Sequence, residues 1–411
     1  MPETMQNRAA RTIARCRELA RITDVPGETT RLFLSEATRD AHALLLGWMA
    51  SAGLETRTDD AGNIRGVRRG TIPNAPALLF FSHIDTVPNA GAFDGPLGVL
   101  LALTVIEELA ATPLPFDIEL IAFSEEEGVR FSFPFLSSLA VTGQLTAEHL
   151  AKEDAAGISV VQALRNFGLH PERIAESCAL PAKTFAALEV HIEQGPVLES
   201  EDMSLAVVES IVGQSRFLLT FTGHANHAGT TPMALRKDAL AAAAQWIAEV
   251  ERYALDYKQL VATIGHVEVL PGAGNVVPGV VRAALDVRHP SDASRHAATA
   301  VLLTKAEAAG ELRGVRVKAE TRMQQNAVPM DRKLTTQLAE AAERAGYAAN
   351  AMFSGAGHDA MILAPHVPTT MLFLRSPGGL SHHPDEAVRE QDVEAAIATT
   401  LEFVTRLEPP Q

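Results

Sequence analysis

An apolar strand, a helix that begins at a proline and a second apolar strand follow one another in this chain, and no other feature constrains its fold as much. Residues 76–82 and 117–123 are apolar runs of strand length. Between them Pro96 stands where the first turn of a helix tolerates proline, and helical spacing continues to about residue 110. A strand, a helix and a strand in this order predict an α/β domain with a mostly parallel sheet. Further helices are expected at 9–22 and 37–49, and further strands at 54–58, 63–68 and 186–190.

A second unit is predicted at residues 213–327, where strand and helix patterns alternate in the order β-α-β-β-α-β. This order is the ferredoxin-like split pattern. We therefore expect a ferredoxin-like α+β domain of residues 213–327, inserted into an α/β domain of residues 1–212 and 328–411. Its strands are expected at 216–222, 259–269, 279–286 and 315–320, and its helices at 236–253 and 293–308.

The chain is acidic, with 50 Asp and Glu residues against 35 Lys and Arg residues and a formal charge of −15. A surface that binds nucleic acid or an anionic membrane needs clustered Lys and Arg, and no dense run of them occurs. The longest apolar runs, such as residues 41–50, are shorter than the ~20 residues of a membrane span. These features argue against nucleic acid and membrane as partners.

The two cysteines, Cys16 and Cys178, fit a reducing compartment better than a disulfide framework. The N-terminal segment lacks the unbroken apolar core of a secretory signal, and its acidic residues argue against a transit peptide. We therefore expect a cytoplasmic protein.

Two segments of the α/β domain carry residue types that bind divalent metal. His83 and Asp85 end the strand 76–82, and alternate residues of an extended segment share a face. Asp94 precedes the helix that begins at Pro96. The alternatives are a solvent-exposed His and Asp at a strand end and, for Asp94, a helix cap.

Three consecutive glutamates, Glu125, Glu126 and Glu127, follow the apolar strand 117–123 directly. Three acids in a row usually form a solvated turn. At the carboxyl end of a strand in an open α/β sheet, however, they lie where such sheets place their ligand crevice. One glutamate can then coordinate a metal while its neighbour transfers a proton.

Three isolated histidines are further candidates for binding metal. His191 follows the strand 186–190, and His382 and His383 belong to the segment GGLSHHPDE. A single histidine is more often structural than a ligand, so His42, His149, His170 and His296 are given no role.

Taken together and in order, these segments resemble the hydantoinase/carbamoylase amidases, which include allantoate amidohydrolases, N-carbamoyl-L-amino-acid hydrolases and beta-ureidopropionases. These enzymes belong to the aminoacylase and carboxypeptidase group of dinuclear zinc hydrolases. The resemblance covers nearly the whole chain, and its matching segments are SHIDTVPNAGAFDGPLGVL, FSEEEGVRF, HIEQGPVLE, GHANHAGTTPM, GNVVPG, DVRH, SGAGHDA and GGLSHHPDE.

The resemblance implies a zinc-exopeptidase-like catalytic domain that holds two divalent metal ions. Zinc is the expected metal, and manganese and cobalt are alternatives. Because the family usually has Ser-His-Asn where this chain has Ser-His-His, His383 is a rival to His382. The implied ligands are His83 and His191 for one metal, Glu127 and His382 for the other and Asp94 as the bridge, with Glu126 as general base and Asp85 orienting a liganding imidazole.

The resemblance also implies a homodimer formed through the inserted domain, which acts as a dimerisation and lid domain, with His227 reaching the active site of the partner subunit. Residues 131–138, which include Phe-Ser-Phe-Pro-Phe, depart from the family pattern on the substrate-side wall, so the resemblance does not imply which ureido compound is the substrate. The implied substrate-binding residues are Gln194, Asn275, Arg288, Gly357 and His358.

The expected reaction is metal-dependent cleavage of the carbamoyl (ureido) C–N bond of a small carboxylate-bearing substrate, with release of amine, CO2 and ammonia. An aminoacylase or dipeptidase is the alternative on the same dinuclear core. A non-catalytic binding protein is a further alternative, but none of the implied metal ligands nor Glu126 is missing. A purely structural oligomer is the least favoured reading.

Overall fold

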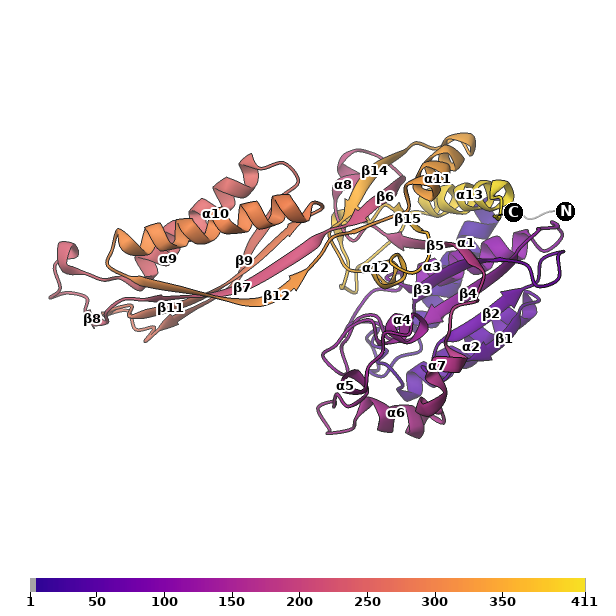
Figure 1. The fold of residues 1–411 in the computed structure, drawn as a ribbon, viewed down its shortest axis with the longest axis horizontal. Helices are drawn as coiled ribbons and strands as arrows, with labels where there is room; N and C mark the ends of the chain where they lie inside the picture. Colours follow the sequence, from indigo (N-terminus) through magenta and orange to yellow (C-terminus); the bar gives the residue numbers. More distant parts are fainter. Residues whose placement is uncertain (1–4, 411) are drawn as a thin grey trace. The chain divides into compact units, whose positions relative to one another are not determined.

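The computed structural model describes residues 5–410, which form two compact units (Figure 1). One unit comprises the chain up to Glu209 and from Pro329 onward, and the other is Ser210–Val328. Residues 1–4 and 411, which the expected α/β domain includes, lie outside the described residues.

A nine-stranded sheet forms the centre of the larger unit. The four adjacent strands β4, β3, β5 and β15 are parallel, whereas β2 pairs antiparallel with β4, β1 with β2, and β6 with β15. A mixed α/β fold with a mostly parallel central sheet is therefore confirmed. In sheet order the strands are β1 (Glu55–Thr58), β2 (Ile64–Arg68), β4 (Asp117–Phe123), β3 (Ala77–His83), β5 (Thr184–Ile192), β15 (Thr369–Leu374), β6 (Leu205–Ile211) and β13 (Val328–Pro329), with β14 (Ala349–Ser354) paired to β6.

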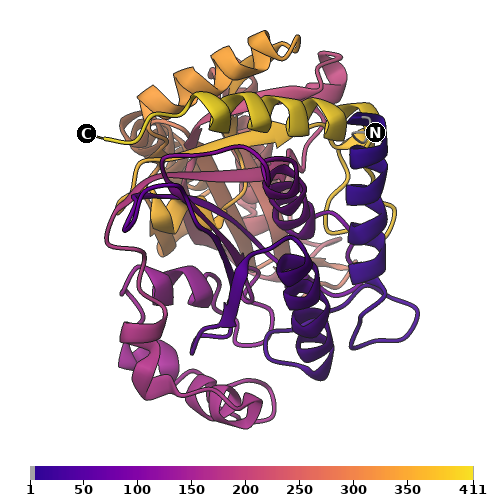
Figure 2. The same ribbon diagram turned by 90° about the vertical axis from the view of Figure 1, so that its right-hand side faces the viewer.

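The helix α3 (Pro96–Glu108) is apolar on all sides because it is buried on all sides. It packs on β3 and β5 and is covered in turn by α1 (Met5–Ala20) and α13 (Glu390–Arg406), which also contact each other (Figure 2). Its one hydroxyl, on Thr104, lies 2.7 Å from the Thr12 hydroxyl of α1 and 3.0 Å from the Leu100 carbonyl oxygen, so this buried hydroxyl has partners.

The remaining helices of this unit lie around the sheet and in its connecting loops. The longer helix α2 packs on β1 and β2, and α11 packs on α13 and β15. The bounds are α2 (Glu36–Ser51), α4 (Leu136–Val141), α5 (Ala147–Leu150), α6 (Val160–Phe167), η1 (Pro171–Arg173), α7 (Ile174–Ser177), α8 (Val197–Ser200), α11 (Arg332–Arg344), α12 (Asp359–Leu363) and η3 (Pro377–Gly379).

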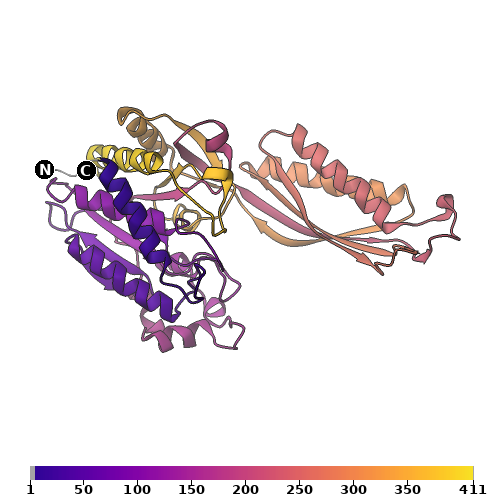
Figure 3. The ribbon, with the colours of Figure 1, turned by 180° about the vertical axis from the view of Figure 1, so that it is seen from behind.

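The smaller unit is a four-stranded antiparallel sheet with two long helices on one face (Figure 3). Its core is apolar around Trp246, which is fully buried and donates its indole N–H to the carbonyl of Leu302 at 2.9 Å. The strands, in sheet order, are β12 (Arg316–Gln325), β7 (Gly213–Thr222), β11 (Val280–His289) and β9 (Val261–Leu270), and the helices are α9 (Ala239–Asp256) and α10 (Asp292–Glu311).

A short hairpin-like pair extends from one end of this sheet. The strands β8 (Asn226–His227) and β10 (Val276–Val277) pair with each other, with His227 opposite Val276, and η2 (Met233–Leu235) follows β8. This pair is additional to the regular β-α-β-β-α-β order, and it places His227 on the short strand β8 and not on the main sheet.

Among residues 5–410, no helix is long and apolar enough to cross a membrane. Cys16 and Cys178 are buried and carry free thiols.

Candidate active site

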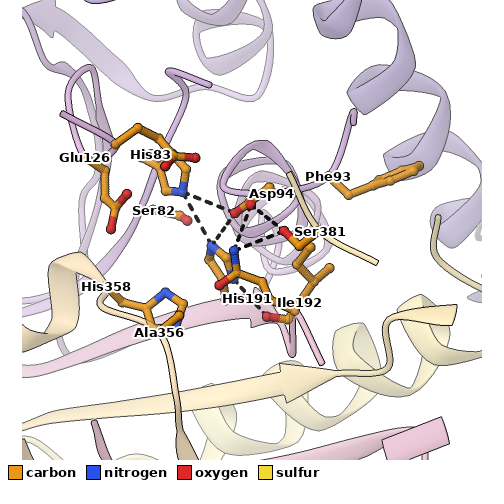
Figure 4. A network of polar contacts seen from close by, with 12 residues as sticks. Ser82, His83, Phe93, Asp94, Glu126, His191, Ile192, Ala356, His358 and Ser381 are labelled. Atoms are coloured by element: carbon orange, nitrogen blue, oxygen red, sulfur yellow. Dashed lines mark hydrogen bonds and ion pairs between the residues drawn. The ribbon is translucent and has the colours of Figure 1, made fainter. Parts of the chain in front are cut away.

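Two histidines meet where the parallel strands β3 and β5 end. His83 is the last residue of β3 and His191 is the last but one of β5, and both side chains are buried. Because adjacent parallel strands end at the same edge of the sheet, the two Nε2 atoms lie only 3.5 Å apart (Figure 4). Both nitrogens face the loop that precedes α3.

Asp94, in that loop, directs one carboxylate oxygen to each of two groups of ligand atoms. Its Oδ1 lies 3.3 Å from His191 Nε2 and 3.6 Å from His83 Nε2. Its Oδ2 lies 3.2 Å from His382 Nε2, which is in turn 3.4 Å from Glu127 Oε1. A carboxylate placed between two sets of ligands has the arrangement of a bridge between two cations.

The donor set fits divalent metal. The ligand atoms of His83, Asp94 and His191 lie within 4.8 Å of one another, as do those of Asp94, Glu127 and His382. Imidazole nitrogen and carboxylate oxygen are the ligands of catalytic zinc sites and also suit manganese and cobalt. Gly95 has a φ of +82°, and a Cβ at this position would lie 2.5 Å from the His83 ring, so glycine is required for the close approach.

Asp85 holds two parts of the site in place. Its carboxylate accepts hydrogen bonds from the backbone N–H groups of Glu126 and Glu127 at 3.0 Å each, and Oδ1 lies 3.4 Å from His83 Nδ1. The ring of His191 is oriented in a similar way, because its Nδ1 lies 2.9 Å from the carbonyl oxygen of Ile192. Such contacts on the outer nitrogen turn Nε2 toward a metal.

The electrostatics of the site reflect several carboxylates in a small buried volume. Burial raises the pKa of Glu126 well above its usual value. Burial also opposes ionisation of Asp94, but the contacts with His191, His382 and His83 outweigh it and hold its pKa well below the usual value. Contacts with Asp94 and Glu127 raise the pKa of His382 to about 10. Nearby positive charge therefore stabilises the ionised carboxylates, and protons or metal ions can supply that charge.

Comparison with known proteins agrees with this geometry. Residues 79–406 match the model of peptidase family M20/M25/M40. The chain belongs to this family. M20 proteins are metal-dependent, and the two groups of ligand atoms around Asp94 are in keeping with that property.

Several similar proteins are named as amidohydrolases, deiminases or amidases. The chain is 39% identical to an N-carbamoyl-L-amino acid amidohydrolase of Geobacillus stearothermophilus, over 92% of this chain and 93% of that protein. It is 37% identical to an allantoate deiminase of Arabidopsis thaliana, over 95% of this chain and 81% of that protein. A hydantoinase/carbamoylase family amidase of Burkholderia multivorans has a similar structure, with a TM-score of 0.91, 34% identity and coverage of 96% of this chain and 97% of that one.

The structure distinguishes between the alternatives that the sequence left open for the glutamates, for Asp94 and for the pair His382 and His383. Glu125 and Glu126 are buried, so the solvated turn is wrong. Asp94 does not cap α3, because the N-cap residue is Gly95 and no side chain bonds the first turn. The structure brings His382, and not His383, to Asp94 and Glu127.

The expected substrate-binding residues of the larger unit lie near the two groups of ligands. Gln194 donates its amide to Asp94 Oδ2 at 2.8 Å. His358 is buried, with its ring centroid 4.5 Å from that of His191 and its Nε2 3.0 Å from the Ser354 hydroxyl. A Cβ on Gly357 would lie 3.0 Å from the ring of Phe135, so the atypical segment 131–138 forms a wall beside Gly357.

Asn275 and Arg288, in the smaller unit, are not brought together. The carbonyl of Asn275 accepts the N–H of Ala228 beside His227, at the end of the sheet where β11 begins with Val280. Arg288 lies eight residues further along β11, roughly 26 Å away at the rise of a strand, and its guanidinium bonds Asp286. Within a single chain the two residues therefore lie too far apart to contact the same small carboxylate.

Two functional residues were missed by the sequence analysis. Ser381 donates its hydroxyl to Asp94 Oδ2 at 2.7 Å. Glu386 is buried and accepts the N–H groups of Phe93 and Asp94 on Oε1 at 2.8 and 3.0 Å, while its Oε2 lies 3.3 Å from the Ser381 hydroxyl. Burial raises the pKa of Glu386 to about 7. The one available signal was that both residues belong to the segment that carries His382.

A third missed residue, Glu189, is fully buried on β5 two residues before His191. Its carboxylate accepts the N–H of Ala360 at 3.0 Å and lies 3.4 Å from the Ser82 hydroxyl. The two-residue spacing put it on the same face as His191, which was a usable signal.

Replacing Glu386 with alanine is expected to weaken metal binding about 10–100-fold, the usual cost of losing a group that orients a ligand. The reason is that Glu386 ties the Asp94 loop to the segment that carries His382. Titration against a competing chelator measures the affinity. The neighbouring Asp385→Ala variant is the control, because the Asp385 side chain is exposed and its ion pair is with the exposed His383. Equal affinities in the two variants would contradict the assignment.

Proposed function

We propose that the protein is a dinuclear metal-dependent amidohydrolase that cleaves the carbamoyl (ureido) C–N bond of a small carboxylate-bearing substrate. The observation that carries the proposal is the Asp94 carboxylate between the His83–His191 pair and His382, with the buried Glu126 beside them. The names of the two relatives favour N-carbamoyl-L-amino acids or allantoate as substrate. The two free, buried cysteines support a cytoplasmic location for the protein.

His83 and His191 would hold one metal ion, Glu127 and His382 the other, and Asp94 would bridge them. Zinc is the expected metal, with manganese or cobalt as alternatives. When bound, two such ions lower the pKa of a water molecule toward 7 and provide positive charge near the substrate carbonyl. Asp85 keeps the His83 ring and the Glu126–Glu127 backbone in the required orientation.

Glu126 is the proton-transfer group of this proposal. One of its carboxylate oxygens lies within 4.8 Å of the ligand atoms of His83 and Glu127, so it is next to the place where a water would attack. It accepts the proton as the water oxygen bonds to the ureido carbon, and it returns the proton to the departing amine when the C–N bond breaks. The carbamate that is released decomposes to CO2 and ammonia.

Substrate binding in this proposal needs two subunits. His227 and Asn275 lie at one end of the sheet of the smaller unit and Arg288 at the other, so one small substrate cannot contact both ends within a single chain. We propose a homodimer in which His227 and Asn275 serve the site of the partner subunit. The edge strands β9 and β12 offer unpaired backbone groups through which smaller units can associate across a two-fold axis.

Complementation tests the shared site. The variants His227→Ala and Glu126→Gln are each expected to be nearly inactive alone. If His227 acts in the partner's site, mixing them with subunit exchange gives mixed dimers with one site that has neither defect. Since half of the dimers are mixed and each has one such site, about a quarter of the wild-type activity should return.

The matched control is a mixture of Glu126→Gln with Glu127→Gln. Both of these defects fall on the metal-binding unit, so every site keeps one of them and no activity should return. If the His227→Ala mixture is as inactive as this control after exchange has been verified, the shared site is refuted.

A substrate panel tests the reaction itself. Metal-reconstituted protein should release ammonia from allantoate, from N-carbamoyl-L-amino acids or from carbamoyl-beta-alanine. The N-acetyl analogue of each amino acid is the matched control, since it offers an amide without the ureido group. Hydrolysis of only the N-acetyl compounds would favour an aminoacylase over the proposed function.

A further inference from the structure

Three phenylalanines alternate along the atypical segment that follows the triple glutamate, and two of them have ring partners. The ring of Phe131 is buried and lies edge-on to Phe33, with the centroids 6.2 Å apart. The ring of Phe133 stacks on His149 with the centroids 4.5 Å apart. Phe135 differs, because its ring is half-exposed and no aromatic or cationic partner of it is found among residues 5–410. The ring of Phe135 is therefore free to contact a ligand.

The backbone of Phe135 has the left-handed conformation, with φ +67° and ψ 19°. Glycine adopts this conformation without strain, whereas a bulky residue in it is rare. The surrounding structure holds the strained residue, since its N–H donates to the carbonyl of Glu126 at 3.1 Å and its carbonyl accepts the N–H of Leu139 at 2.9 Å. Residues held in this way cluster at binding and catalytic sites. The backbone alone does not account for a phenylalanine at this position, so we looked for a role of the ring.

The tip of the ring lies against Gly357, the residue before His358. A Cβ on Gly357 would be 3.0 Å from Phe135 Cζ, so the glycine permits a close approach. The ring of His358 is buried, with its centroid 4.5 Å from that of the proposed metal ligand His191. Phe135 is thus placed from two sides, by a backbone bond to the proton-transfer residue Glu126 and by a ring contact beside His358.

We propose that Phe135 is a specificity-determining residue whose ring contacts the substituent on the α-carbon of the substrate, and that it favours N-carbamoyl-L-amino acids with an apolar side chain. A half-exposed phenyl ring is stabilised when an apolar group covers it. Allantoate carries a second ureido group in place of that side chain, and a ureido group against a phenyl ring loses hydrogen bonds to water without replacing them. This inference rests on the proposed function and distinguishes between its two substrate classes.

The preference is measured as the ratio of kcat/KM for N-carbamoyl-L-leucine to kcat/KM for N-carbamoylglycine, since these two compounds differ only in the side chain. In the metal-loaded wild type we expect a ratio well above one, and a lower kcat/KM for allantoate than for N-carbamoyl-L-leucine. Phe135→Ala should lower the ratio by about 10-fold or more, the lower end of what one methylene contributes to discrimination in an apolar site. Alanine keeps the Cβ and with it the backbone strain, so only the ring is lost.

Phe133→Ala is the matched control, because it removes the same ring from the same segment at a position where the ring stacks on His149. This variant should keep the wild-type ratio, and Phe135→Leu, which keeps an apolar side chain, should keep most of it. Melting temperatures of all three variants identify any general loss of stability. The proposal is wrong if Phe135→Ala leaves the ratio unchanged, if Phe133→Ala lowers it equally, or if the wild type prefers allantoate.

Calorimetry separates this proposal from the proposed reaction. In metal-loaded Glu126→Gln protein the ligands bind without turnover, so the Kd values of N-carbamoyl-L-leucine and N-carbamoylglycine are measured directly. Adding Phe135→Ala should reduce the preference for the leucine compound by about the same factor as in the kinetics. If the wild type hydrolyses no ureido compound, the proposed function fails, while a binding preference that depends on the ring still upholds the role of Phe135. Binding without such a preference, or no binding of either compound, would contradict that role even if ureido hydrolysis were observed.

Discussion

Replacing Glu126 with glutamine is expected to lower kcat by about 10²–10⁴-fold, the usual contribution of a general acid–base group. Glutamine has nearly the same shape, but it cannot take a proton from the attacking water or return one to the amine. Metal content should remain close to that of the wild type, because the ligands around Asp94 are untouched. Steady-state kinetics and metal analysis on the same preparation measure both quantities.

Glu127→Gln is the matched variant for this prediction, since the two residues are adjacent and carry the same functional group. Glu127 Oε1 lies 3.4 Å from His382 Nε2, so its loss should lower metal occupancy as well as turnover. If Glu126→Gln lost metal and Glu127→Gln kept it, the two roles would have to be exchanged.

Removal of metal is expected to abolish turnover, because in the proposed mechanism the bound metal ions acidify the attacking water. Exhaustive chelation followed by addition of zinc, manganese or cobalt should remove and then restore ammonia release. Undiminished activity in a sample shown to be free of metal would refute the mechanism.

Metal removal should also lower the melting temperature. Metal ions that bind only the folded state stabilise it, and without them the carboxylates of the buried Asp94 and Glu126 and of the half-buried Glu127 repel one another. A circular dichroism spectrum that is unchanged at low temperature shows that the loss of activity is not a loss of fold. A lower melting temperature after metal removal shows that the folded protein binds the metal. An unchanged melting temperature would show that the metal does not stabilise the folded state.

The parallel core of the fold was predictable because its signals are local. Pro96 marks the start of α3 to the residue, and the apolar run of β4 coincides with Asp117–Phe123. The strand β15, by contrast, was not predicted, although it lies beside β5 in the centre of the sheet. A fully buried strand of six residues has no alternation, and its pattern does not differ from that of a short buried helix.

The candidate site was predictable where a motif was long and unpredictable where partners are distant in sequence. The position of Asp94 before a helix predicts by itself only a helix cap. Its partner His382 is almost 290 residues further along the chain, so no local sequence pattern connects the two. Glu386 was missed for the same reason, because its hydrogen bonds to Phe93 and Asp94 join opposite ends of the chain.

The distance between Asn275 and Arg288 within one chain was not predictable from the sequence. Both residues were correctly assigned to the inserted segment, but their separation depends on the register of β11 against β7. Arg288 pairs with Gln214, whereas Val280, near Asn275, pairs with Thr222 at the other end. Register is set by packing across the whole sheet, which periodicity along one strand does not reveal.

Anomalous diffraction from crystals of the zinc-loaded protein tests the central claim most directly. Two peaks at the zinc absorption edge should lie on either side of Asp94, about 3.5–4 Å apart, one next to His83 and His191 and the other next to Glu127 and His382. A single peak, or a pair that leaves Asp94 unliganded, would contradict the dinuclear site and the mechanism built on it.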